Sequence, residues 1–240
     1  MPDRSSPAAP RSPRSPRGPD GRTSSLRERI LDRALERFNA EGIEYLGVRE
    51  LAKDLGVKGG HITYYFPTKD DLVAAVGGQL RELNDATISI PETPSLHAFL
   101  GMLRQVFLNH YRFRCLFLSL PHLLMHNEKV AAGYVGPVER GRREVLATVL
   151  ASVRDAGELH ASTSPDEIER LVGFVGLVSR GWIGDAAISH RDRTPRWCMV
   201  HYLRVVCDHL RGFATGKGRQ ELARFEAELE AWGEEEGDEL

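Results

Sequence analysis

The sequence predicts an all-α protein in which a small three-helix domain precedes a larger helical domain. Three observations support this fold class. Apolar residues recur every three or four positions along most of the chain after residue 23, as they do on one face of an α-helix. Helix-start signals precede several of these segments. Segments with the strict alternation of apolar and polar residues that marks a half-buried strand are absent.

The first predicted helix begins after Ser25. Glu28 stands three residues later, so the two side chains can form a capping box. Gly42 follows the last apolar position of the pattern and is expected to end the helix. The apolar face of this helix is formed by Leu26, Ile30, Ala34 and Phe38.

Two short helices are predicted next, over residues 48–55 and 59–65. Gly56, between them, can adopt the positive φ that a tight turn requires. Thr68 is the expected cap of a fourth helix. The apolar face of that helix is Leu72, Val76 and Leu80.

Three further segments open the larger domain. A helix is predicted over residues 95–112. The apolar stretch 115–125 contains Pro121, which should kink or break it. A long helix is predicted over 129–156, ending at Gly157.

Two strong start signals, Ser164-Pro165 and Thr194-Pro195, predict the last two long helices. These helices, at about 165–188 and 195–213, carry apolar residues on more than one face. Small residues that would let helices approach closely are Gly173, Gly176, Gly181 and Gly184.

The composition is that of an ordinary globular protein. The 240 residues carry 32 lysines and arginines against 34 acidic residues, a formal net charge of −2. No apolar run approaches the ~20 residues that cross a bilayer, and the N-terminus lacks the apolar core of a secretory signal. We therefore expect a cytoplasmic protein that does not bind a membrane. The cysteines form no CxxC pair and are expected in the apolar core: Cys115, Cys198 and Cys207.

The two ends of the chain differ in charge. Residues 1–23 are rich in proline, serine and arginine, which predicts a disordered basic arm. This arm either contacts DNA or is a leader without function. Residues 216–240 are predicted to form an acidic C-terminal helix or tail, and the acidic part from Glu221 onward is expected to be solvated.

The segment around Gly56 carries the pattern of a DNA-reading helix-turn-helix. Ala52 is small where the second short helix would cross the first. A shared apolar core is predicted for Leu51, Leu55, Val57 and Ile62. In such a motif the second helix enters the major groove of DNA. The sequence therefore predicts a DNA-binding domain over residues 24–70, and a structural helical hairpin without DNA binding is the alternative.

The second short helix suits that role. Its exposed positions, by elimination, are Lys58, Gly59, Gly60, His61, Thr63 and Tyr64. Glycines at its start leave backbone N–H groups open to phosphate. His61 and Thr63 are short enough to reach base edges, and the hydroxyls of Tyr64 and Tyr65 can contact phosphates. No acidic residue stands within 57–68, so attraction to DNA is local.

Residues 26–85 resemble the N-terminal domain of the TetR family of transcriptional regulators. The matching residues are Ile30-Leu31-Asp32, Ala34-Leu35, Phe38, Gly42, Val48-Arg49, Leu51-Ala52, Gly56-Val57, Gly60, Tyr64-Tyr65-Phe66, Lys69 and Leu72. The chain departs from the family at Gly47, where threonine or serine is common. The resemblance implies that bases face Gly60, His61 and Thr63. It also implies that phosphates are held by Tyr64, Tyr65, Thr68 and Lys69.

The resemblance further implies a variable helical domain, here residues 71–215, that binds a small molecule and forms a homodimer through its last two long helices. In this chain those are the helices at about 165–188 and 195–213, whose apolar faces could instead pack tightly within one subunit. The implied function is regulation of transcription from operator DNA, and the family's usual habit is repression that an inducer relieves. The sequence does not identify the inducer. Aromatic and polar side chains that could line its pocket, each of which could instead be core or surface, are Phe107, Phe117, His122 and Trp182.

An enzyme is the first rival interpretation. The sequence contains no nucleophile with its base, no paired carboxylates, no phosphate loop and no zinc set, so neither catalysis nor a cofactor is expected. The second rival is a helical protein-interaction module or small-molecule binder that does not bind DNA. A gel shift with upstream DNA would separate these interpretations.

Overall fold

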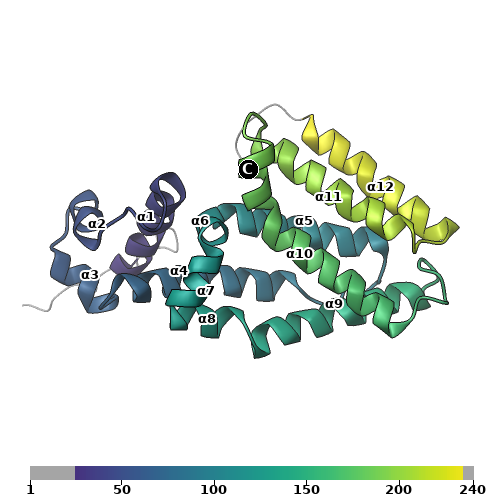
Figure 1. Cartoon of the computed structure of the whole chain (residues 1–240), viewed down its shortest axis with the longest axis horizontal. Helices are drawn as coiled ribbons and strands as arrows, with labels where there is room; N and C mark the ends of the chain where they lie inside the picture. The colour runs from purple at the N-terminus through teal and green to yellow at the C-terminus, as the bar shows by residue number, and fades with distance from the viewer. Residues whose placement is uncertain (1–24, 235–240) are drawn as a thin grey trace, which may run out of the picture.

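The computed structural model describes residues 25–234, and within this range the protein is built of helices (Figure 1). The N-terminal part consists of α1 (Leu26–Glu41), α2 (Val48–Asp54), α3 (Gly59–Tyr65) and the first turns of α4 (Lys69–Thr87). The larger part adds α5 (Leu96–Arg112), α6 (Arg114–Leu118), α7 (Leu120–His126), α8 (Glu128–Tyr134), α9 (Pro137–Asp155), α10 (Pro165–Ser189), α11 (Pro195–Arg211) and α12 (Gly216–Gly233). The predicted all-α fold class is confirmed. The predicted basic arm, residues 1–23, lies outside the described residues.

The molecule is elongated, with α1, α2 and α3 at one end and α5 to α12 packed around the other (Figure 1). Helix α4 runs from the first group into the second. It packs on α1 in the first group and on α5 and α8 in the second. One helix therefore belongs to both parts.

Local capping chemistry sets the boundaries of the N-terminal helices as the sequence predicts. The Glu28 amide donates to the Ser25 hydroxyl at 3.2 Å, and the Glu28 carboxylate accepts from the Ser25 amide at 2.8 Å. Gly42 ends α1 with φ of 93°. The Thr68 hydroxyl accepts from the Asp71 amide at the start of α4.

The long helix expected over 129–156 is wrong, because two helices occupy this segment. α8 ends at Tyr134 and α9 begins at Pro137. Between them Gly136 has φ of 74°, a left-handed conformation that interrupts a helix. Proline has no N–H and fits the first position of a helix, so Pro137 starts α9 rather than continuing α8.

The solvated tail expected from Glu221 is also wrong as far as α12 extends. Leu222, Phe225 and Leu229 of α12 are fully buried against α5 and α11. Glu228 and Glu230 of the same helix are exposed, so the acidic composition of the segment hides an apolar stripe. Gly218 permits the close packing, because an added Cβ would lie 2.0 Å from the Glu158 carbonyl oxygen.

Helix α10 is apolar enough to resemble a membrane span. Among the described residues it is the helix whose length and composition would allow it to cross a bilayer, with a mean hydropathy of 1.4 in its best window. It packs against α5, α6, α9 and α11 in the body of the protein. Its apolar composition is thus that of a partly buried core helix. The three cysteines are free and buried, as expected.

Candidate nucleic-acid interface and ligand cavity

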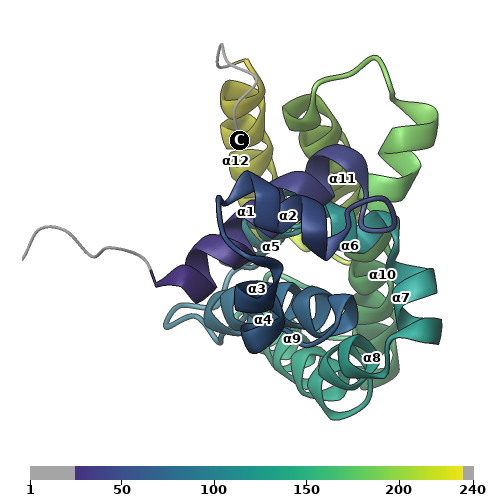
Figure 2. The ribbon, with the colours of Figure 1, turned by 90° about the vertical axis from the view of Figure 1, so that its left-hand side faces the viewer.

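The turn between α2 and α3 has the geometry of a helix-turn-helix. Gly56 adopts φ of 65°, and the Val57 amide donates to the Ala52 carbonyl at 3.0 Å to close the turn. Ile62, on the inner face of α3, is fully buried, and Ala52 of α2 is buried where the two helices meet. The opposite side of α3 is thereby fixed toward solvent. Figure 2 views the molecule from this end, with no other helix in front of α3.

Ion pairs fasten α1 to the end of α2. The Asp54 carboxylate accepts from both Arg33 and Arg37. Arg37 also bonds to Glu41, and this hydrogen bond lowers the pKa of the Glu41 carboxyl. Two arginines of α1 are therefore paired with carboxylates of the same part of the protein.

The structure brings the predicted DNA contacts together on one surface. Their side chains or backbones belong to α3, to its N-cap and to the start of α4, and all are exposed except Gly59 and Lys69, which are half-buried: Lys58, Gly59, Gly60, His61, Thr63, Tyr64, Tyr65, Thr68 and Lys69. The Tyr64 side chain is 81% exposed. Its ring meets the Tyr65 ring edge-on at 5.1 Å between centroids.

The start of α3 has open backbone donors. Lys58 is the N-cap and forms no side-chain cap, and the Gly59 and Gly60 amides have no hydrogen-bond partner among the described residues. An added Cβ at either glycine would meet nothing within 4 Å. An acceptor such as a phosphate can therefore approach these N–H groups without obstruction.

The half-buried Lys69 side chain does not extend freely into solvent but contacts the protein. Its ammonium donates to the Glu44 carbonyl at 3.0 Å and so ties the loop after α1 to the start of α4. An ammonium has three N–H donors, so two remain for other acceptors. Thr68 uses its hydroxyl in the cap of α4.

Other exposed groups near this surface were not predicted. Tyr45 is 80% exposed in the loop that Lys69 holds, and its ring lies against Gly42. Arg49 is exposed in the first turn of α2. An aromatic residue in a short loop before a helix-turn-helix is the signal that could have indicated Tyr45.

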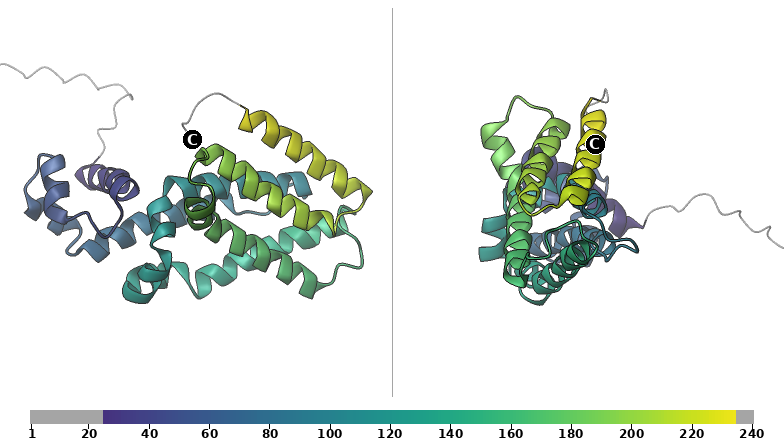
Figure 3. Two further views of the ribbon diagram at one scale, coloured as in Figure 1. Left: turned by 45° about the horizontal axis from the view of Figure 1, so that its top comes forward. Right: turned by 90° about the vertical axis from the view of Figure 1, so that its right-hand side faces the viewer.

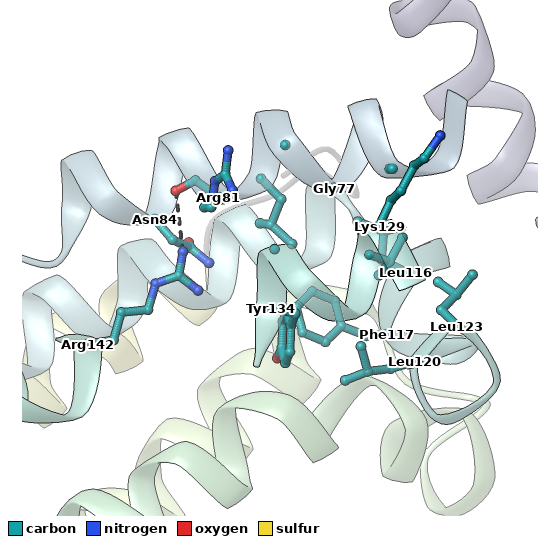
Figure 4. Close-up of a pocket in the computed structure, with 15 residues that line it drawn as sticks. Gly77, Arg81, Asn84, Leu116, Phe117, Leu120, Leu123, Lys129, Tyr134 and Arg142 are labelled. Carbon is teal, nitrogen blue, oxygen red and sulfur yellow. Dashed lines mark hydrogen bonds between the residues drawn. The ribbon is translucent and has the colours of Figure 1, made fainter. Parts of the chain in front are cut away.

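A cavity lies beside α4 in the larger part, with a volume of about 220 Å³. Its walls come from α4, α6, α7, α8 and α9, as the close-up in Figure 4 shows. A smaller cavity of about 60 Å³ adjoins it. The two share Asn84, Tyr134 and Arg142 as lining residues.

The four residues predicted for the pocket lie in three places. Phe117 lines the larger cavity. Phe107 and Trp182 stack on each other in the core, with centroids 5.4 Å apart and rings 3° from parallel. His122 lies in a separate, open depression between α1 and α7. The buried histidine beside the cavities is instead His110, which lines the smaller one.

His110 is held neutral. Burial lowers its pKa to about 4, and the positive charges of Arg142 and Arg180 act in the same direction. Its Nδ1 lies 2.8 Å from the Ser179 carbonyl oxygen, and its Nε2 lies 3.2 Å from the Asn84 amide nitrogen. A neutral ring with a proton on Nδ1 satisfies both contacts. This network joins α4, α5 and α10 at the edge of the cavity.

Helices α10 and α11 lie side by side at the outside of the body (Figure 3). Several of their apolar side chains are exposed. Leu177 is 66% exposed and Ile188 is 80% exposed on α10. Trp197 and Val205 of α11 are also exposed. Gly181 and Gly184 lie on the same side of α10 as Leu177 and Ile188 by helical spacing, so another helix could approach here.

Two family models match the chain. Residues 30–76 match the model of bacterial regulatory proteins of the tetR family. Residues 79–222 match the TetR model, described as a bacterial transcriptional repressor. No curated protein matches the chain.

Solved structures share the fold. A TetR-family transcriptional regulator from Marinobacter aquaeolei VT8 aligns with a TM-score of 0.78 at 20% identity, over 86% of this chain and 99% of that one. A transcriptional regulator from Saccharomonospora viridis in complex with choline aligns with a TM-score of 0.61 at 16% identity, over 77% and 95%. The ketosteroid transcriptional regulator KstR2 of Mycobacterium tuberculosis aligns with a TM-score of 0.57 at 16% identity, over 81% and 98%.

Proposed function

This chain belongs to the TetR family of DNA-binding transcriptional regulators, which are not enzymes, and we propose that it acts as a homodimeric repressor that a small molecule releases from its operator. The observation that carries the proposal is the exposed surface of α3. Its side chains point to solvent, its first amides are open, and no acidic residue stands within 57–68. Because its operator is chromosomal DNA, we place its action in the cytoplasm.

The exposed residues divide into two roles. Gly60, His61 and Thr63 lie on the outer face of α3, where short side chains in a major groove meet base edges. The remaining contacts carry hydroxyls or charges suited to phosphate, which fixes register without reading sequence: Lys58, Tyr64, Tyr65, Thr68 and Lys69. Gly59 contributes its open amide to the same phosphate set.

A homodimer is proposed through the uncovered apolar side of α10 and α11. Two copies of α3 about 34 Å apart would enter successive major grooves on one face of DNA. Exposed leucine, isoleucine and tryptophan side chains on this side would lose contact with water on association. The small residues of α10 support close approach of the partner's helices.

Contacts between the cavity and α4 offer a route for release. Lys129 lines the larger cavity, and its ammonium pairs with Asp71. That pair lowers the pKa of the Asp71 carboxyl, which also accepts from the Thr68 amide and hydroxyl in the cap of α4. We propose that a ligand in the cavity changes the position of Lys129 and, through Asp71, the start of α4 beside the DNA contacts.

A second route runs through the loop after α1. The Ser119 hydroxyl between α6 and α7 donates to the Glu44 carboxylate at 2.8 Å, and Lys69 donates to the Glu44 carbonyl. α6 and α7 also line the cavity. A ligand that prefers one arrangement of these helices therefore shifts the population of DNA-competent molecules.

The proposal is tested by measuring binding of the full chain to DNA upstream of its own gene, at several salt concentrations. We expect a shifted complex whose affinity falls as salt rises, since phosphate contacts release counterions. Light scattering on the same sample should give the mass of two chains. Absence of any shift on neighbouring intergenic DNA, or a monomer bound to DNA, would contradict the proposal.

A further inference from the structure

We infer that the cavity beside α4 is built for a small organic anion, a carboxylate or similar group on an apolar body. The inference deepens the proposed function and rests on it, because it names the class of ligand for that same cavity. Three features carry it: the kind of polar groups that face the cavity, the apolar walls opposite them, and two glycines of α4 that leave the space open.

The polar groups of the larger cavity are hydrogen-bond donors with unused capacity. Arg81 forms no ion pair or side-chain hydrogen bond within residues 25–234. Arg142 donates to Asp85 and to the Arg81 carbonyl through Nε and Nη2, which leaves Nη1 unused. The Tyr134 hydroxyl likewise has no hydrogen-bond partner among the described residues.

No carboxylate lines this larger cavity. Two acidic side chains next to it are paired with arginine or lysine side chains that line it. Asp71 pairs with Lys129, and Asp85 pairs with Arg142. In the adjoining smaller cavity Glu139 pairs with Arg180 at 2.8 Å. Arg81 is exposed to solvent and is the arginine of this lining for which no ion pair is found within residues 25–234, so an anion that enters the cavity can pair with it.

The tyrosine remains a donor over the whole physiological range. Burial raises the pKa of Tyr134 to about 12, so the phenol is neutral when a ligand enters. Tyr134 lines both cavities and stands where they meet. Charge-assisted hydrogen bonds from two guanidinium groups and a phenol suit the oxygens of a carboxylate.

The opposite wall is apolar. Figure 4 shows Phe117, Leu120 and Leu123 on the side of the cavity away from the guanidinium groups of Arg81 and Arg142. A ligand with its charge at the α4 side would place its carbon skeleton against these side chains. Burial of that skeleton gives affinity, and the arginines select the charge.

Two consecutive glycines of α4 keep the cavity open. Gly77 and Gly78 line it, and an added Cβ at either would meet nothing within 4 Å. Glycine inside a helix costs about 1 kcal/mol relative to alanine. No neighbouring atom requires a glycine here through close packing. The two glycines therefore serve to leave the cavity volume empty.

The test titrates the full-length protein with butanoate, hexanoate, octanoate and decanoate, each compared with the amide and the amine of the same length, by calorimetry. We expect at least one carboxylate to bind, at least tenfold more tightly than its neutral and cationic counterparts. Arg81→Gln should weaken that carboxylate about tenfold. Arg104→Gln, on α5 and outside both cavities, is the matched control and should bind normally.

Filling the cavity gives an independent test. Gly78→Leu should abolish binding, whereas Gly101→Leu on α5, where an added Cβ also meets nothing within 4 Å, should retain it. Circular dichroism checks that both variants fold. If Gly78→Leu unfolds, the Arg81 comparison decides.

The inference is overturned if no carboxylate binds, if amide or amine binds equally well, or if Arg81→Gln leaves affinity unchanged. DNA binding by the ligand-free protein is measured in parallel. A chain that binds operator DNA but no carboxylate contradicts the ligand class alone. A chain that binds a carboxylate in this cavity but no DNA contradicts the proposed function alone.

Discussion

The surface proposed to bind DNA and the cavity proposed to bind a ligand are built in opposite ways. The first comes from one stretch of chain, Lys58 to Lys69, and its side chains are mostly exposed. The second is assembled from α4, α6, α7, α8 and α9, whose lining residues run from Ala74 to Arg142. A continuous surface can be recognised from sequence because spacing along one short helix fixes which residues share a face. A cavity depends on how several helices pack, so sequence neighbours say little about it.

Because the larger part of the protein contains the buried core, we expect substitutions there to lower the free energy of unfolding most. Phe107→Ala removes a fully buried ring that stacks on Trp182, and we expect it to lower the free energy of unfolding by about 3–5 kcal/mol. Tyr64→Ala, at an exposed position, should change it by less than about 0.5 kcal/mol while weakening DNA binding. Urea denaturation of both variants measures this. Equal losses of stability in the two variants would contradict the expected difference between the core and the exposed surface.

The second effect depends on pH. His110 has a pKa of about 4 in the folded protein against 6.5 in the unfolded chain, so the unfolded state binds more protons between these values. The contribution of neutral His110 to the free energy of unfolding is fully present above about pH 6.5. It is lost as the pH falls toward 4, and the loss amounts to about 3 kcal/mol. Unfolding free energies measured at pH 7 and pH 4.5 should show this loss. In His110→Gln the slope over the same window should be smaller, and an unchanged slope would contradict the assignment.

The third prediction separates the residues proposed to contact bases from those proposed to contact phosphates. His61→Ala or Thr63→Ala should change operator preference by about 1–3 kcal/mol at one base pair. Lys58→Ala and Lys69→Ala should weaken binding to all sequences alike and reduce the salt slope by about one. Binding to an operator library at several salt concentrations distinguishes them. If the two sets of variants changed sequence preference and salt dependence alike, the proposed division into base and phosphate contacts would be wrong.

The smallest effect concerns the turn itself. Gly56 has φ of 65° in open space, so Gly56→Ala costs only the strain of that conformation, about 1–2 kcal/mol. Gly60→Ala, in a helix with equal space, is the control and should not destabilise the fold, since alanine favours helix. Thermal melting compares the two. A neutral Gly56→Ala would mean that the turn does not need glycine.

Much of the fold was predictable because the signals are local. Capping boxes at Ser25 and Thr68 set helix starts, and the φ of Gly56 and Gly42 set turns. The break at Gly136 was missed although its signal is also local, since glycine followed by proline marks a turn. For the cavity, sequence reasoning placed Phe117 in the lining, whereas Phe107 and Trp182 fill the core instead.

The sequence by itself determined the helix-turn-helix and the residues that α3 exposes, because periodicity, caps and turn glycines act over a few residues. Tertiary structure alone decided that α12 packs into the body through Leu222 and Phe225, that Lys69 is tied to Glu44, and that Arg81 faces a cavity opened by Gly77 and Gly78. These features arise where helices distant in the chain meet. Their contacts depend on packing geometry, which no short stretch of sequence contains.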